Sequence, residues 1–505
     1  MDKIDEVILK KSGFKKIMKF FKLERAPENI PSVSVLIGSL YREIKISKAT
    51  ETTTNINAQN LYEKIHTGDK IGGVFNNKQL ISLFNTSLSV PTSTAQNNKN
   101  KFFFSPFISE IGSYGLATRN TNKGSWNPGA FITAIIANYS PCEDSFVTTM
   151  NALFECLRDT QNDPWAKIIS LEFKSINQTL NIEMHEKFDE EHFRTKYNDD
   201  NDFKELLKYS NHAKLCFQDL NIIIRLKDSL TRQKWLGIFE AYLRLTLFNH
   251  IIYTMNLSRT YINFIVSKIE ENKEVDYTDL EFFLNQATSN DYILMDVNTQ
   301  RTSYIENNLR KYCYYNTVLD AIFEKLLGER FEDFKDINHF ISISNEVINS
   351  LKTKQINLNE FILEFKKEQE EMLDKISPIN PKALKNIKEC LEYLCQKKAS
   401  SKSDASPDVN YIFDREYHSG NSPYKFDLSA GMISTLCCLI FSKLDDNQNF
   451  ISGVEFIGRI KGYNINLNIR DISYGKIKNT MQSLGVIIDS PDNEGGVLIL
   501  RPGWI

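Results

Sequence analysis

Residues 235–268 read WLGIFEAYLRLTLFNHIIYTMNLSRTYINFIVSK and form the longest and most apolar stretch of the chain. Apolar and aromatic residues recur there at every third or fourth position and also crowd the positions between, which predicts a buried central helix. One helix and two helices joined near Asn249 and His250 both fit this pattern. Arg244, His250 and Arg259 interrupt the run before it reaches the roughly 20 residues that span a bilayer. The stretch is therefore expected to be a core and not a membrane span.

Length and charge limit the class of protein. With 505 residues the chain is too long for one hydrophobic core, and about two to four domains are expected. Hydrophobic residues at 41% and charged residues at 25% are ordinary for a globular protein. The formal net charge of −3 excludes a uniformly basic surface, so any contact with nucleic acid is expected to come from a local patch.

The cysteines and the N-terminal segment both predict a cytoplasmic location. The eight cysteines lack the spacing of a disulfide framework and are expected to be small buried hydrophobes of a reducing compartment. Residues 1–25 lack the uninterrupted apolar region of an export signal and contain eight Lys or Arg against four acids. Their apolar residues can share a helical face, which predicts either a capping helix with solvated lysines or a contact with anionic lipid or nucleic acid.

The predicted fold is mainly α with a small α+β portion at the N-terminus. In that portion, residues 131–157 are expected to be helical, and 167–173 (KIISLEF) and 178–184 to be strands. Residues 32–46 fit either a short strand or a buried helical turn. Residue 106 is a proline and is expected to open a helix after an exposed loop at 88–101.

Four regions follow from composition and periodicity. Residues 1–200 are the N-terminal α+β region, 201–397 a multi-helical core domain, 398–422 a linker poor in large apolar residues, and 423–505 a compact C-terminal domain. Within the core, helices are expected at 203–209, 229–267, 304–327, 337–351, 358–376 and 381–397.

The C-terminal domain is predicted to be winged-helix-like. Helices are expected at 428–444, 452–461 and 471–484, followed by two short apolar runs around a Pro-Asp-Asn-Glu-Gly-Gly turn that indicates a hairpin. The domain is formally neutral, because residues 423–505 contain eight basic and eight acidic residues. Non-specific duplex binding requires several phosphate contacts, so protein docking and DNA reading are both open. The candidate DNA-contacting residues of the third helix are Lys476, Lys478, Asn479 and Gln482.

A second candidate for DNA contact lies in the core. Residues 299–316 (TQRTSYIENNLRKYCYYN) carry Arg301, Arg310 and Lys311 among four tyrosines. Basic residues interleaved with aromatic ones can bind phosphate and stack on bases. The same residues at helical spacing also fit a packed face with a solvated edge.

Sequence motifs of common enzyme classes are missing. The chain has no GxxxxGK[ST] phosphate loop and no GxSxG nucleophile motif. Asp163, Glu172 and Lys174 resemble the acid and Glu-x-Lys set with which some nucleases hold a divalent ion and position water, provided that strands carry them. A half-exposed strand without catalytic function fits them as well. No catalytic residue is assigned from the sequence, and the metal-dependent nuclease is kept as an alternative.

The segment HEKFDEEH contains His185, Glu186 and His192 but does not predict a zinc site. Zinc on a helix requires two histidines one turn apart, and these are seven residues apart, about 10 Å along a helix. An exposed acidic loop is expected instead. No metal and no cofactor are predicted.

Three features give the chain a resemblance to the DptG (also called DndG) family, the middle subunit of the restriction module that accompanies bacterial DNA phosphorothioation. They are the aromatic helix LTLFNHIIYTMNLSRTYINFI, the segment DYILMDV followed by RTSYIENNLRKYCYYN, and the three helices and hairpin behind the linker. Together they cover residues 235–316 and 423–505.

The resemblance implies a non-catalytic subunit of an antiphage restriction complex that attacks DNA lacking the protective modification. ATPase and helicase or nuclease subunits would be its partners, double-stranded DNA a further one, and no membrane would be involved. The chain would act as a scaffold or a DNA-positioning component. A stand-alone winged-helix DNA-binding regulator is the remaining alternative.

Overall fold

The computed structural model of the chain describes residues 35–68, 70–85, 106–114, 128–160, 162–197, 210–286, 295–296, 337–353, 397, 408–415, 424–489 and 496–505. The basic segment 1–25, the loop 88–101 and the helices expected at 203–209, 304–327 and 358–376 lie outside these residues. Of the helix expected at 381–397, residue 397 alone is described. Arg301, Arg310 and Lys311 lie outside them as well. The described part of the chain is mostly helical, which confirms the prediction of a mainly α protein.

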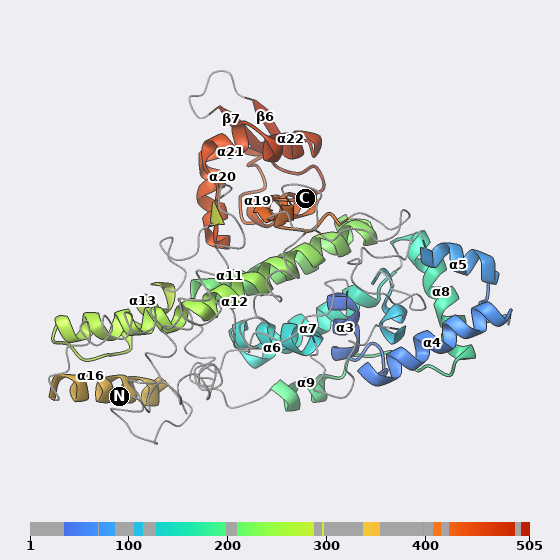
Figure 1. The fold of residues 1–505 in the computed structure, drawn as a ribbon, viewed down its shortest axis with the longest axis horizontal. Helices are drawn as coiled ribbons and strands as arrows, with labels where there is room; N and C mark the ends of the chain where they lie inside the picture. The colour runs from blue at the N-terminus through green and yellow to red at the C-terminus, as the bar shows by residue number, and fades with distance from the viewer. Residues whose placement is uncertain are drawn as a thin grey trace, which may run out of the picture.

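One helix, α12 (Arg232–Glu270), runs through the middle of the molecule for 39 residues (Figure 1). Of the two predicted alternatives, the single helix is the one observed. The polar pair at its centre does not break it, because both side chains have buried partners. Asn464 donates a hydrogen bond to Asn249 at 3.1 Å, and the Tyr139 hydroxyl lies 2.8 Å from Nδ1 of His250. None of the described helices is both long and apolar enough to cross a membrane.

The described residues before α12 form short helices that lie along it and beyond its N-terminal end (Figure 1). They are α3 (Val35–Glu43), α4 (Glu51–Thr67), α5 (Asn77–Asn85), η1 (Ser109–Tyr114), α6 (Pro128–Tyr139), α7 (Glu143–Arg158), α8 (Pro164–Thr179), α9 (Glu190–Tyr197), α11 (Asn211–Arg225) and η2 (Leu226–Ser229). The helical prediction for 131–157 is confirmed with a break at 140–142. Of the two alternatives for 32–46, the helical one is observed, as α3. The helix expected to open at residue 106 begins instead at Ser109 and is the short 3₁₀ helix η1.

The strand predicted at 167–173 is wrong, because these residues belong to helix α8. Asp163 accepts a hydrogen bond from the backbone N–H of Ala166 at 3.0 Å and caps the helix, which begins with Pro164 at a position that favours proline. The buried residues Ala166, Ile169, Phe173 and Ile176 follow helical spacing. The second predicted strand, 178–184, contributes a single antiparallel bridge between Met184 and Ser47. Within the described residues 35–197 that bridge is the extent of the β structure.

Two further helices cover the C-terminal end of α12. They are α13 (Thr278–Gln286) and α16 (Ile337–Thr353), and the second confirms the helix predicted at 337–351. Their contact is aromatic: the ring of Tyr261 on α12 lies 6.0 Å from Phe283 and 5.7 Å from Phe340, both edge-on. The Tyr261 hydroxyl also lies 3.0 Å from the Ser344 hydroxyl, so a buried polar atom is satisfied within an apolar contact.

The C-terminal module (residues 424–505) contains helices and a small antiparallel sheet. Its helices are α19 (Ala430–Phe441), α20 (Gly453–Ile460), η4 (Lys461–Tyr463), α21 (Ile469–Ser473) and α22 (Lys476–Ser483). β4 (Phe450–Ser452), β7 (Val497–Leu500) and β6 (Ile487–Asp489) form the sheet in the order β4-β7-β6. The predicted hairpin is therefore confirmed as β6 and β7. The third predicted helix is two helices, because Tyr474 is extended and Gly475 after it adopts a positive φ of 87°, which separates α21 from α22.

The module is packed on α12 with part of the predicted linker. Helix α19 lies against α12, and β5 (Ile465–Asn466) pairs in parallel with β1 (Met295–Asp296). Residues 408–415, which were assigned to the linker 398–422, contain the buried side chains of Tyr411 and Ile412. This segment also contributes β2 (Phe413–Arg415), which pairs with β3 (Tyr424–Phe426). The described end of the linker is thus part of the core that joins the module to α12.

Candidate functional site

The charged side chains of α22, the predicted DNA-reading helix, are occupied by acids of the same chain. Lys476 forms ion pairs with Asp427 and, at 3.4 Å, with Asp414. Lys478 forms an ion pair with Asp489 at 2.7 Å. Both lysines of α22 are therefore paired with acids in the structure.

The two remaining candidates on α22 differ from the lysines. Asn479 and Gln482 are exposed. They lie three residues apart on one helix and so face the same side. Two exposed amide side chains can form hydrogen bonds with base edges or with a protein backbone. They are neutral and so do not attract the phosphate charge.

Lys476 belongs to a cluster of alternating charges. Lys397 lies 3.1 Å from Asp414, so Asp414 is shared by two lysines. Burial raises the pKa of Asp427, which the bond from Lys476 offsets only in part. Burial alone would lower the pKa of Lys476, but the hydrogen bond to Asp427 and the charges of Asp427, Tyr411 and Asp414 together outweigh that effect and raise the pKa. Two lysines and two aspartates compensate one another, which leaves little charge to attract DNA phosphate.

The outward face of the three-stranded sheet is apolar. The register places Phe450 opposite Leu500, and Leu498 opposite Ile488, so these four side chains share one face. Phe450 is 55% exposed and Ile488 is 50% exposed, and the two leucines are half-buried. Val454, 63% exposed, follows directly in the first turn of α20. An apolar sheet face suits contact with protein better than contact with a phosphate backbone.

Other cations of the module are paired too. Five of its lysines and arginines form ion pairs with acids of this chain: Lys443, Arg459, Lys476, Lys478 and Arg501. Lys443 is the most informative of these, because it reaches out of the module to Asp219 on α11. Burial raises the pKa of Asp219 to about 6, and the charge of Lys443 opposes that rise. Lys443 also donates a hydrogen bond to the Tyr463 hydroxyl at 3.1 Å.

A buried ion pair fixes the segment before the module to α12. Arg244 lies 3.2 Å from Asp408, and their side chains are 4% and 3% exposed. Glu240, one turn before Arg244, accepts two hydrogen bonds from the same guanidinium and one from the Asn410 amide. These residues were not among the sequence-predicted sites. The signal was an arginine within the most apolar helix, which is rarely found without a carboxylate partner.

The nuclease-like residues do not form a catalytic site. Glu172 is buried on α8, and its carboxylate accepts backbone N–H groups of Gly73 and Val74 at 3.1 and 2.6 Å and of Phe75 at 3.4 Å. The Asp163 carboxylate caps the start of the same helix. Lys174 is 62% exposed and lies 3.9 Å from Glu110. Each group therefore has a structural contact of its own, and the three do not converge on one point.

Metal-ligand geometry is likewise missing from the described residues. Within them, no group of three His, Cys, Asp or Glu side chains could hold a metal ion. His192 lies on α9, whereas His185 and Glu186 precede that helix. Burial lowers the pKa of both histidines.

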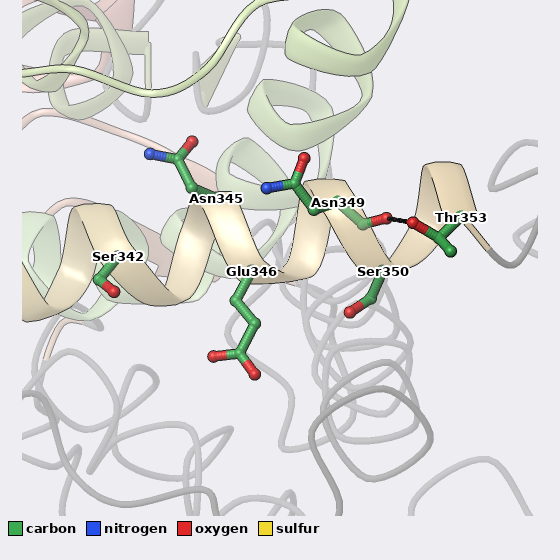
Figure 2. A pocket seen from close by; sticks show the side chains of 6 residues that line it. All are labelled: Ser342, Asn345, Glu346, Asn349, Ser350 and Thr353. Carbon is green, nitrogen blue, oxygen red and sulfur yellow. Dashed lines mark hydrogen bonds between the residues drawn. The ribbon is translucent and has the colours of Figure 1, made fainter.

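A polar hollow lies along α16. Its described lining comes from that helix alone, from Ser342, Asn345, Glu346, Asn349, Ser350 and Thr353 (Figure 2). Asn345 is already occupied, because its amide exchanges hydrogen bonds of 2.7 and 3.1 Å with the backbone of Val275. Thr353 donates its hydroxyl proton to the Asn349 carbonyl oxygen at 2.7 Å. Side chains of one helix cannot surround a ligand, so we assign no site to them.

Comparison with known proteins adds no relative: no family model, curated protein or solved structure matches the chain.

Proposed function

We propose that this chain is a non-catalytic subunit of a bacterial DNA-targeting defence complex, where it acts as a cytoplasmic scaffold or DNA-positioning component. The observation that carries the proposal is the buried ion pair between Arg244 and Asp408, together with that between Lys443 and Asp219. The first ion pair holds the segment before the module on α12, and the second holds the module against α11, so together they give the module a set orientation, as a scaffold requires. The resemblance of residues 235–316 and 423–505 to the DptG family supplies the class of complex. ATPase and helicase or nuclease work then belongs to partner subunits.

We infer that the C-terminal module is a winged helix. The order α19, β4, α20, α21, α22, β6 and β7 supports this, because β4 pairs with β7 and completes a wing of three strands. The paired lysines of α22 and the apolar outward face of the sheet favour a module that docks on protein. In this proposal, the module positions the subunit within the complex, and double-stranded DNA is contacted mainly by its partners.

Affinity purification from the native cells tests the proposal. The tagged full-length chain is expected to elute with an ATPase and a helicase or nuclease subunit at fixed stoichiometry, measured by native mass spectrometry. Phe450→Ser with Ile488→Ser should release at least one partner, because both side chains are half exposed on the apolar sheet face. Phe282→Ser, which removes a 61% exposed phenylalanine from α13, is the matched control and should release none. A chain that elutes alone contradicts the proposal.

A further inference from the structure

Helix α8 presents large apolar side chains to solvent at helical spacing. Trp165, Ile168 and Leu171 are 42%, 41% and 55% exposed and lie three residues apart. Val74, which is 73% exposed, and Phe75 come from the loop held against this helix. The Phe75 ring lies edge-on to Trp165 with 6.4 Å between centroids. We call these five residues the α8 face. Contiguous exposed apolar surface of this kind marks interaction sites in proteins.

The α8 face is held in place before any partner binds. The buried carboxylate of Glu172 accepts N–H groups from Gly73, Val74 and Phe75 and so fixes the loop on the helix. A Cβ atom at Gly72 would lie 1.8 Å from Oε1 of Glu172, so a side chain there would displace the carboxylate that holds the loop. A preformed surface loses little conformational entropy on binding, which favours affinity.

The exposed charged side chains of α8 are lysines, of which Lys174 also lies 3.9 Å from the buried Glu110. Lys167 and Lys174 are exposed on α8, and Lys70 and Lys78 are exposed on either side of the loop in sequence. Glu172 is the one acid within α8, and it is buried under the loop. The apolar stripe is thus bordered on its own helix by lysines alone.

We propose that the α8 face is the docking site for an acidic amphipathic helix of a partner protein. Trp165, Ile168 and Leu171 extend over about 9 Å of helix, which matches anchors at i, i+3 and i+7 of one partner helix. Carboxylates beside those anchors would meet Lys167 and Lys174. The inference rests on the proposed scaffold role for the existence of a partner, but not on a DNA-targeting function.

The lysines beside the α8 face argue against two other binding partners, a second copy of the chain and a lipid surface. A second copy of the chain would bring this face against itself by two-fold symmetry and place like-charged lysines together. A lipid surface gains about 1 kcal/mol for each nearby lysine, and stable anchoring needs a polybasic cluster or a second signal. The two lysines on α8 fall short of that.

A binding experiment with the purified full-length chain tests the site. The probe is a fluorescent helical peptide of about 18 residues, with Leu at i, i+3, i+4 and i+7 and Glu at its other exposed positions. Its anisotropy should report saturable binding. Ile168→Ser with Leu171→Ser, both at exposed positions, should weaken that binding by about tenfold or more. Phe282→Ser on α13, at the opposite end of the molecule (Figure 1), should leave it unchanged.

Further measurements test the preference for an acidic peptide and whether lipid or a second copy of the chain binds the α8 face instead. The same peptide with Lys in place of Glu should bind at least about tenfold more weakly. Equal binding of the two peptides, no binding, or binding that survives Ile168→Ser with Leu171→Ser overturns the proposal. Sedimentation with phosphatidylserine vesicles, or dimer formation, that depends on Ile168 and Leu171 overturns it in favour of lipid or of a second copy. Since the peptide assay needs no native partner, its result is separate from that of the affinity purification.

Discussion

Arg244 and Asp408 are 164 residues apart in the chain and form an ion pair of 3.2 Å between two almost completely buried side chains. The burial costs both groups their hydration, and their mutual contact, the bonds from Arg244 to Glu240 and the Asn410 N–H bound to Asp408 help to compensate. The pair therefore determines where the segment before the C-terminal module lies on α12. It is also the contact most sensitive to loss of one partner.

Replacing Arg244 by Ala should destabilise the protein strongly. The substitution leaves Asp408 buried without its cation, which typically costs about 3–5 kcal/mol of unfolding free energy. Urea unfolding followed by circular dichroism measures the loss. Arg459→Ala is the matched control, because Arg459 pairs with Glu455 one turn away on an exposed surface and should cost less than about 1 kcal/mol. Similar losses for both variants would contradict the buried pair.

His212 should make the protein less stable in acid. Burial, with the nearby charge of His250, lowers the pKa of His212 to about 3, while the unfolded chain keeps a value near 6.5. Between these values the unfolded state binds the extra proton, so stability is complete above pH 6.5 and is lost as the pH falls. The loss should approach about 1.4 kcal/mol per pH unit.

The matched variant for this prediction is His212→Phe. It keeps an aromatic ring beside Tyr253, whose ring centroid lies 4.7 Å from that of His212. Urea midpoints of the wild-type chain and the variant at pH 5 and pH 6.5 should show a shallower pH dependence in the variant. Parallel curves would show that His212 is not buried in its neutral form.

Glu172 is expected to stabilise the fold and to have no part in DNA cleavage. Glu172→Ala leaves three backbone N–H groups of the loop 73–75 without their acceptor and should cost about 2–4 kcal/mol. Hydrogen exchange at Val74 and Phe75 should accelerate. Lys174→Ala, at a 62% exposed side chain, should change stability by less than about 0.5 kcal/mol. Magnesium-dependent DNA cleavage that Glu172→Ala abolishes in a folded protein would restore the nuclease alternative.

Lys476 should contribute to folding more than to DNA binding. Lys476→Ala leaves Asp427 and Asp414 as neighbouring carboxylates and should lower the unfolding free energy by about 1 kcal/mol or less, since the lysine is half exposed. Gln482→Ala on the same helix is the control and should have no effect. For any duplex binding, the slope of log K against log salt should stay unchanged. A decrease of about 0.9 would mean that Lys476 contacts a phosphate.

Sequence periodicity predicted the elements whose apolar residues all face the core. It located α12 and α16, because there the spacing of apolar residues matches their burial. The hairpin of β6 and β7 was indicated by its turn residues between two short apolar runs, although Ile488 on its outward face is 50% exposed. It failed at α8, where Ile168 and Leu171 are apolar but exposed. Leu171 gives residues 169–173 an apparent apolar alternation with Ile169 and Phe173, which is why KIISLEF resembles a strand in the sequence.

The functional contacts were less predictable. Lys476 and Lys478 were identified as basic residues on an exposed helix, but their pairing with Asp427 and Asp489 depends on how distant segments fold together. The same holds for Arg244 and Asp408. A sequence indicates that a buried charge needs a partner, but it does not tell which of many acids will supply it.

The length of α12 sets a distance between sites on this molecule. At 1.5 Å per residue its 39 residues form a rod of roughly 58 Å. α13 and α16 cover one end, and α8 lies beyond the other (Figure 1). A partner bound at the α8 face would therefore be held at a constant distance from α13 and α16, because α12 is one continuous helix.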